Sequence, residues 1–167
     1  MASDSRYGGG SVRVTGVIKE LSGQATRSVQ PSAAQCFAVL ADVEQYPEWY
    51  PDVIREVAVL ERDGDGQARR ARTKLHLSWG PVVRDFDLVL GVVLEPPTTV
   101  RLARVSDAPS TSTFEATWRV HEAAATELGI ELRATLDVPR FMPLGGIGDA
   151  IAGGFVEAAA RRLGAPG

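Results

Sequence analysis

Few side chains in this sequence have the type and spacing that acid–base or metal chemistry requires. The two histidines, His76 and His121, alternate with apolar residues in strand-like segments and fall among charged neighbours. Successive strand residues point to opposite faces, so we interpret both histidines as solvated. No carboxylate at metal-ligand spacing accompanies them on that face, and we therefore expect no metal site and no cofactor.

The single cysteine, Cys36, is the next candidate for chemistry. It lies between apolar residues of a helix-like segment, next to Phe37, and no histidine is near it in sequence to act as a base. Free cysteines in such surroundings belong to protein cores. We interpret Cys36 as a buried structural residue. One cysteine also excludes an internal disulfide, which fits a reducing, cytoplasmic location.

Two arginines break otherwise apolar strand faces. Arg84 shares a face with Phe86 and Leu88, and Arg104 joins it if Val100 and Leu102 point inward. Each guanidinium either reaches water from a strand end or orients a carbonyl, phenolate or carboxylate of a ligand. Arg84 is the best catalytic candidate, although catalysis itself is uncertain. Thr73 is the other inward polar residue that we can place.

Aromatic residues gather in two places. Trp79, Phe86, Phe114 and Trp118 fall on the apolar strand faces, where they form either a core or the wall of a pocket. A second group occupies five residues of a short helical turn, where it braces the mouth of a cavity or clamps a helix to a sheet. Its members are Tyr46, Trp49 and Tyr50.

The elements that position these residues follow from periodicity and turn signals. A strand over 24–29 precedes a helix that Pro31 opens and a helical turn between Pro47 and Pro51. Six strands follow, with Asp63-Gly64-Asp65-Gly66 as a strong hairpin signal. They are predicted over 53–62, 67–79, 82–94, 98–105, 110–121 and 127–138.

The chain after Leu144 returns to a helical period. One stripe, spaced four residues apart, consists of Ile147, Ile151, Phe155, Ala159 and Leu163. Helices separated from an antiparallel meander indicate the α+β class. One face of the meander is apolar and needs a cover, which the last helix provides. A single helix is about 10–12 Å across, too narrow to fill a wide curved sheet, and this favours a cavity over a solid core.

Glycines are unusually frequent where this last helix begins and in its middle, at positions 145, 146, 148, 153 and 154. The pattern superficially resembles a dinucleotide-binding loop. Ile151 occupies the position where that loop needs Gly or Ala, so we reject nucleotide binding. We expect instead that Gly153 and Gly154 let the helix bend or approach a ligand closely.

The length and charge of the chain limit the classes of partner that we expect. The chain has 167 residues and a net charge of −3, from 18 basic and 21 acidic residues. This balance gives no reason to expect nucleic acid, and no apolar run is long enough to span a membrane. We expect a cytoplasmic monomer or weak homodimer. Residues 1–21 are predicted to be a flexible tail or an extra strand, and 22–164 a single ligand-binding domain.

The predicted order of elements resembles the helix-grip fold of the START-like SRPBCC superfamily, in the branch of polyketide cyclases/dehydrases and lipid transport proteins. The resemblance covers Gly23 to Leu163. Its most specific part is the pattern V-x-x-Y-P-x-W-x-P from Val43 to Pro51. It implies a curved antiparallel sheet of six to seven strands wrapped around a long C-terminal helix, with two short helices after the first strand.

The resemblance and the apolar inner face suggest that the protein binds a hydrophobic small molecule, such as a lipid, a quinone or a polyketide, as a carrier or binding protein. The alternative is a polyketide aromatase/cyclase that uses the same cavity; a module that docks a protein partner through an apolar rim is a weaker third hypothesis. The predicted ligand-binding residues are Tyr46, Trp49, Tyr50, Trp79, Arg84, Phe86, Leu88, Arg104, Phe114, Trp118, Leu132, Phe141, Ile151 and Phe155.

Overall fold

The computed structural model describes residues 16–79, 82–105, 113–140 and 144–164. Seven strands form one sheet in the order β1-β7-β6-β5-β4-β3-β2, and every neighbouring pair is antiparallel. The strands are β1 Gly16–Val29, β2 Ile54–Arg62, β3 Ala68–Trp79, β4 Val82–Glu95, β5 Thr99–Arg104, β6 Phe114–Glu122 and β7 Thr126–Pro139. The prediction of a six- to seven-stranded antiparallel sheet is confirmed.

The first strand is longer than the sequence indicated. β1 begins at Gly16, not at Gln24, and pairs with β7 over its full length, from Gly16 opposite Pro139 to Val29 opposite Thr126. The local alternation before Gly23 is too weak to reveal this pairing. Because β7 supplies a continuous partner, residues 16–21 are part of the strand, and the expected division after position 21 falls inside β1.

Two short helices follow β1, as the resemblance implied. They are α2 Ala33–Ala41 and α3 Tyr46–Trp49, with a 3₁₀ turn, η1 Val43–Gln45, between them. Ser32 caps α2: its hydroxyl accepts from the Gln35 amide, and the Gln35 side chain accepts from the Ser32 amide. Pro31 therefore precedes the cap and is not the first helical residue, because the reciprocal Ser–Gln capping box fixes the helix start.

The long C-terminal helix, α4 Ile147–Gly164, packs against β1 and β7 at one end of the sheet. Its approach to β1 is a backbone contact: a Cβ built on Gly23 would lie 2.0 Å from the Gly148 carbonyl carbon. Asp149 reinforces this contact, because its Oδ1 accepts from the Gln24 amide at 3.0 Å. Two glycines, one on each element, thus let the start of α4 touch the strand directly.

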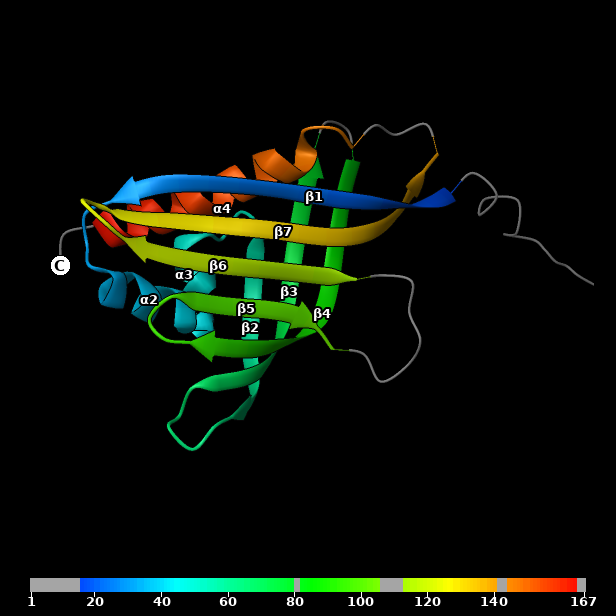
Figure 1. Cartoon of the computed structure of the whole chain (residues 1–167). Helices are drawn as coiled ribbons and strands as arrows, with labels where there is room; N and C mark the ends of the chain where they lie inside the picture. The colour runs from blue at the N-terminus through cyan, green and yellow to red at the C-terminus, as the bar shows by residue number, and fades with distance from the viewer. Residues whose placement is uncertain (1–15, 80–81, 106–112, 141–143, 165–167) are drawn as a thin grey trace, which may run out of the picture.

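The sheet is strongly curved. Figure 1 shows β3 and β4 standing nearly crosswise to β1, β6 and β7, with all the helices on the same, inner side. The predicted inner faces are the buried ones: Leu88, Leu90 and Val92 of β4 are buried, whereas Asp85 and Asp87 are exposed. The apolar alternation therefore points toward the helices, as expected.

No helix among the described residues is long and apolar enough to cross a membrane.

Candidate ligand-binding cavity

A cavity of about 300 Å³ lies between the curved sheet and α4. Helix α4 contributes Ile151 and Phe155, and the segment before β2 contributes Val53. Most of the wall comes from inward-facing apolar residues of the strands, namely Leu21, Leu75, Leu77, Phe86, Leu88, Phe114, Leu132 and Ala134. The cavity lies between α4, which packs on β1 and β7, and strands β3 and β4, which stand crosswise to β1 and β7 (Figure 1).

Five residues with polar side chains also border the cavity: Asp85, Asp87, Arg104, Thr113 and Thr135. The carboxylates of the two aspartates belong to the outer face. Asp85 lies 2.7 Å from His76 Nδ1, and Asp87 accepts from Arg72 at 2.8 and 3.1 Å. These hydrogen bonds from Arg72 hold the pKa of Asp87 below its ordinary value.

Arg104 is the cationic side chain on the cavity wall among the described residues. It is half-buried at the end of β5, opposite Leu90, and Val100 and Leu102 of the same strand are buried. Arg104 thus faces inward, as the alternation allowed. Thr113 and Thr135 lie nearby on the wall, and the Thr113 amide donates to Thr135 Oγ1 at 2.8 Å.

Arg84, the leading candidate from the sequence, occupies a different place. It is half-buried near the start of β4, opposite Leu77, and it is not among the residues that line the cavity. Both arginines lie on the inner face of the sheet. Arg104 lines the cavity and Arg84 does not, because they sit at different positions along their strands. Alternation carries no information about that position.

A smaller inner pocket of about 30 Å³ continues the cavity. The two spaces share three wall residues, Leu75, Phe114 and Phe155. Beyond them the inner pocket reaches Thr73, Tyr46 and Trp118; its other wall residues are apolar. It is the innermost part of the space between sheet and helices, because Thr73 is 5% exposed and Trp118 is fully buried.

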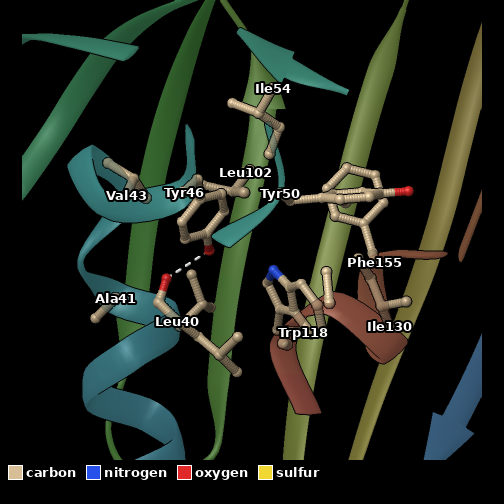
Figure 2. Packing of buried hydrophobic residues seen from close by; sticks show 14 of the residues in the cluster. Leu40, Ala41, Val43, Tyr46, Tyr50, Ile54, Leu102, Trp118, Ile130 and Phe155 are labelled. Atoms are coloured by element: carbon tan, nitrogen blue, oxygen red, sulfur yellow. Dashed lines mark hydrogen bonds between the residues drawn. The ribbon is translucent and has the colours of Figure 1, made fainter. Parts of the chain in front are cut away.

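Tyr46 and Trp118 face each other at this inner end (Figure 2). The Tyr46 hydroxyl donates to the Leu40 carbonyl at 2.5 Å, which ties α3 to α2. Burial raises the pKa of Tyr46 strongly, and the interaction of its hydroxyl with the Trp118 side chain acts in the opposite direction. The hydroxyl is therefore a hydrogen-bonding group and not an acid near neutral pH. Trp118 also contacts Phe155 of α4, with ring centroids 6.2 Å apart.

Trp49 and Tyr50 form the clamp that the sequence offered as one interpretation. Tyr50 packs edge-on against Phe155 with centroids 4.8 Å apart, and Trp49 packs against Tyr46 at 4.7 Å. Both side chains are buried and neither lines the cavity. Tyr50 thus joins the end of α3 to α4, whereas Trp49, whose ring centroid lies 6.3 Å from that of Trp118, joins α3 to the sheet at β6; neither frames an entrance.

The remaining candidates lie away from the cavity or outside the described residues. Cys36 is fully buried, and burial raises the pKa of its thiol, as expected for an inert core residue. His121 is exposed, and His76 lies on the outer face. The side chain of Trp79 and the whole of Phe141 lie outside the described residues. Among the described residues, no group of three or more His, Cys, Asp and Glu side chains is placed to hold a metal ion.

Several wall residues are absent from the set that the sequence predicts. Leu75, Leu77 and Ala134 stand on the predicted apolar faces, so alternation places them correctly without marking them as wall. Leu21 falls in the segment 1–21 that was predicted to be a tail or an extra strand, and its pairing with Ala134 across the β1–β7 ladder is what places it on the wall. Val53 directly precedes β2, and the alternation of the strand does not indicate that its side chain lines the cavity.

A curved antiparallel sheet gripping a C-terminal helix, with a mostly apolar cavity between them, defines the START-like class of folds. The chain matches the family model described as polyketide cyclase/dehydrase and lipid transport over residues 29–163. It therefore belongs to that family. No curated protein matches it.

Solved structures share the fold at low sequence identity. A START superfamily protein from Mycobacterium smegmatis aligns with a TM-score of 0.65 and 19% identity, over 85% of this chain and 96% of that one. A STAR-related lipid transfer protein fragment from Xanthomonas axonopodis aligns at 0.57 and 16%, over 84% of each chain.

The aromatase/cyclase BexL, of the BE-7585A biosynthetic pathway, is a di-domain protein that aligns with a TM-score of 0.62 and 10% identity. The match covers 89% of this chain but 51% of BexL, so this chain spans about half of that protein. Lipid transfer and cyclase proteins thus share this fold, and the fold alone does not separate the two functions.

Proposed function

We propose that this protein binds a hydrophobic small molecule, such as a lipid, a quinone or a polyketide, in the cavity between the sheet and α4, as a carrier or binding protein. The observation that carries the proposal is the cavity of about 300 Å³ with its mainly apolar wall. Ligand pockets in proteins begin at about this volume, and close packing leaves few such spaces without a use.

The family supports the same conclusion, because its description includes lipid transport. The predicted residues on the wall, among them Leu132, Ile151 and Phe155, would enclose the apolar body of the ligand. Burial of that body supplies the binding free energy. The cytoplasmic location and the monomeric or weakly dimeric state stay predictions.

Filling the cavity tests the proposal. Ile151 lines the cavity, whereas its neighbour Ala150 is exposed on α4 and does not. We expect Ile151→Trp to weaken the binding of a fluorescent fatty acid or naphthalene probe by about tenfold or more, because the larger ring occupies ligand space at an overpacking cost. Ala150→Trp, one residue away, should leave the affinity unchanged.

Native mass spectrometry of the purified protein, followed by extraction, supplies a direct measurement. A carrier should retain or readily exchange an apolar molecule, and Ile151→Trp should lose it. If the unmodified protein stays empty against lipids, quinones and aromatic probes, the proposal is wrong. Equal binding by both tryptophan variants would place the ligand elsewhere.

One observation favours the aromatase/cyclase alternative as a second candidate: Arg104 and the Thr113 segment border the otherwise apolar cavity. A guanidinium there would stabilise negative charge that develops on a ketone oxygen during aldol cyclisation. Turnover of a poly-β-ketone surrogate should then be lost in Arg104→Ala and kept in Arg84→Ala, because Arg84 does not line the cavity. Turnover that survives Arg104→Ala would remove this role.

A further inference from the structure

The two ends of the cavity differ in polarity. The inner pocket presents essentially no polar surface, and the Tyr46 hydroxyl beside it already donates to the Leu40 carbonyl. Burying a polar ligand group there would cost free energy, so the inner pocket suits an apolar group. The opposite part of the cavity, which we call the outer end, is bordered by Asp85, Asp87, Arg104, Thr113 and Thr135.

Strand β4 borders the cavity with its edge as well as with its inner face. Four consecutive residues, 85–88, line the cavity. Successive side chains of a strand point to opposite faces, and the carboxylates of Asp85 and Asp87 meet His76 and Arg72 on the outer face. These two aspartates therefore reach the cavity through their backbone.

The sheet is split beside this stretch of β4. Strand β5 pairs with β4 over residues 90–95, and one further hydrogen bond joins the Val105 amide to the Val89 carbonyl. Val89 thus turns its backbone polar groups toward β5, and every second residue of an antiparallel strand turns the same way. The N–H and C=O groups of Asp85 and Asp87 point to that side, where no strand within the described ranges pairs with them.

Arg104 stands at the corner of this split. It lies at the end of β5, opposite Leu90, and is half-buried on the cavity wall. Arg104 already takes part in an interaction within the protein, but a guanidinium carries several N–H donors, and one interaction does not occupy them all. A guanidinium next to backbone N–H groups favours an acceptor with negative charge, and a carboxylate offers two oxygens to such donors.

We propose that the ligand is an amphiphile with a carboxylate head, which lies at the outer end between the Arg104 guanidinium and the open edge of β4, while its apolar tail points into the inner pocket. This inference rests on the proposed function. It narrows the ligand class from hydrophobic molecules in general to anionic amphiphiles that insert tail first.

Decanoate and 1-decanol share one chain and differ in the head, so this pair of probes tests the inference. We expect Arg104→Gln to weaken the binding of decanoate by about tenfold and to leave that of 1-decanol nearly unchanged, because only decanoate loses a charged partner. Arg84→Gln is the matched control, since Arg84 is also half-buried on the inner face but does not line the cavity. Isothermal titration calorimetry measures these affinities.

The protonation of the bound probe is a second measurement, which a merely structural role of Arg104 would not affect. A neighbouring cation favours the charged form of a carboxyl group. With decanoate labelled with ¹³C at the carboxyl, the pKa of the bound carboxyl should therefore be lower in the unmodified protein than in Arg104→Gln. Arg84→Gln should leave this pKa unchanged.

Nuclear magnetic resonance of the unmodified protein tests the orientation. The terminal methyl group of decanoate should show contacts to the side chains of Trp118 and Ile130 in the inner pocket, and the methylene group beside the carboxylate should not. The Asp87 amide proton should move downfield when decanoate binds, as a new hydrogen bond requires. The Val93 amide lies within the β4–β5 ladder and should not move.

The outcomes separate this inference from the proposed function. If Arg104→Gln leaves decanoate affinity unchanged, weakens both probes equally, or if the carboxylate end contacts Trp118, the inference is overturned while the proposed function stands. Binding of 1-decanol without binding of decanoate has the same meaning. Binding of neither probe counts against both. The orientation measurements need no variant, so an Arg104→Gln protein that fails to fold leaves them decisive.

Discussion

At the scale of single residues, two adjacent glycines of α4 meet different surroundings. A Cβ added to Gly154 would lie 2.2 Å from the Tyr50 hydroxyl oxygen, whereas a Cβ on Gly153 would meet nothing within 4 Å. Neither glycine lines the cavity. The prediction was that this pair lets the helix bend or approach a ligand closely; in the structure, Gly154 makes room for the buried Tyr50 ring.

Substitution of the two glycines should have opposite effects. Gly154→Ala pushes against Tyr50, whose buried ring also packs against Phe155, and we expect a loss of about 1–3 kcal/mol in the free energy of unfolding. Gly153→Ala gains helix propensity and should stabilise by about 0.5–1 kcal/mol. Chemical denaturation measures both values.

Tyr50 supplies the control for this pair. Tyr50→Phe removes the hydroxyl that the new methyl group would strike, so Gly154→Ala should cost much less in that background. An undiminished cost there would show that the Tyr50 contact is not the cause.

At the scale of elements, the start of α4 depends on direct backbone contact with β1. A Cβ on Gly148 would lie 1.9 Å from the Ser22 carbonyl oxygen, and one on Gly23 would meet the Gly148 backbone. In both cases the contacted atoms belong to the backbone, so they cannot move aside without separating the helix from the strand. The hydrogen bond from the Gln24 amide to Asp149 shares the same junction.

We expect Gly148→Ala to destabilise the protein by about 3 kcal/mol or more, because backbone cannot give way as a side chain can. It should also weaken binding in the cavity, whose wall includes Leu21 and Ile151 on the two joined elements. Thermal unfolding and probe titration measure these effects. Gly145→Ala is the matched control, since nothing lies within 4 Å of the Cβ position there. A Gly148→Ala protein as stable as this control would refute the contact.

The helix starts illustrate how local sequence decides an element. Ser32 and Gln35 form a reciprocal capping box, which places the start of α2 after Pro31. The predicted strand boundaries lie within a few residues of the observed ones because hairpin turns carry their own residue signals, such as the Asp-Gly pairs between β2 and β3. β1 is the exception, because its extension to Gly16 comes from β7 and not from its own residues.

At the scale of the whole molecule, two carboxylates whose pKa values shift in opposite directions make stability depend on pH. Burial, with a further contribution from Glu44, raises the pKa of Asp42 above its ordinary value. The folded protein thus holds this proton more tightly than the unfolded chain does. The stabilising contribution is complete below the unfolded pKa and is lost as the pH rises through the folded pKa.

Asp42→Asn should therefore raise the unfolding free energy at pH 7 relative to the unmodified protein. The difference should shrink toward about pH 3, where the Asp42 carboxyl is protonated and as uncharged as the asparagine amide. Asp87→Asn should have the opposite effect and lower the unfolding free energy at pH 7. Arg72 lowers the pKa of Asp87, so its contribution is present above the unfolded pKa and lost as the pH falls. Urea unfolding across this pH range measures both, and parallel profiles for the two variants would contradict the assignment.

The inward-facing residues could be identified from the amino-acid sequence without any knowledge of contacts. Alternation in β3, β4, β6 and β7 is a property of each strand alone, and the stripe on α4 is a property of one helix. The V-x-x-Y-P-x-W-x-P segment added the family, which the model match over residues 29–163 establishes.

The space that remains between the layers could not be identified in this way, because it depends on tertiary packing. The cavity follows from the side of the sheet on which α4 packs and from the curvature of β3 and β4, and both depend on contacts between residues far apart in the chain. The same contacts put Arg104 on the cavity wall and Arg84 off it, although both share an inward face. The periodicity of a strand or helix shows which way its side chains point. The distance between the sheet and α4 is set by all the side chains that pack between them.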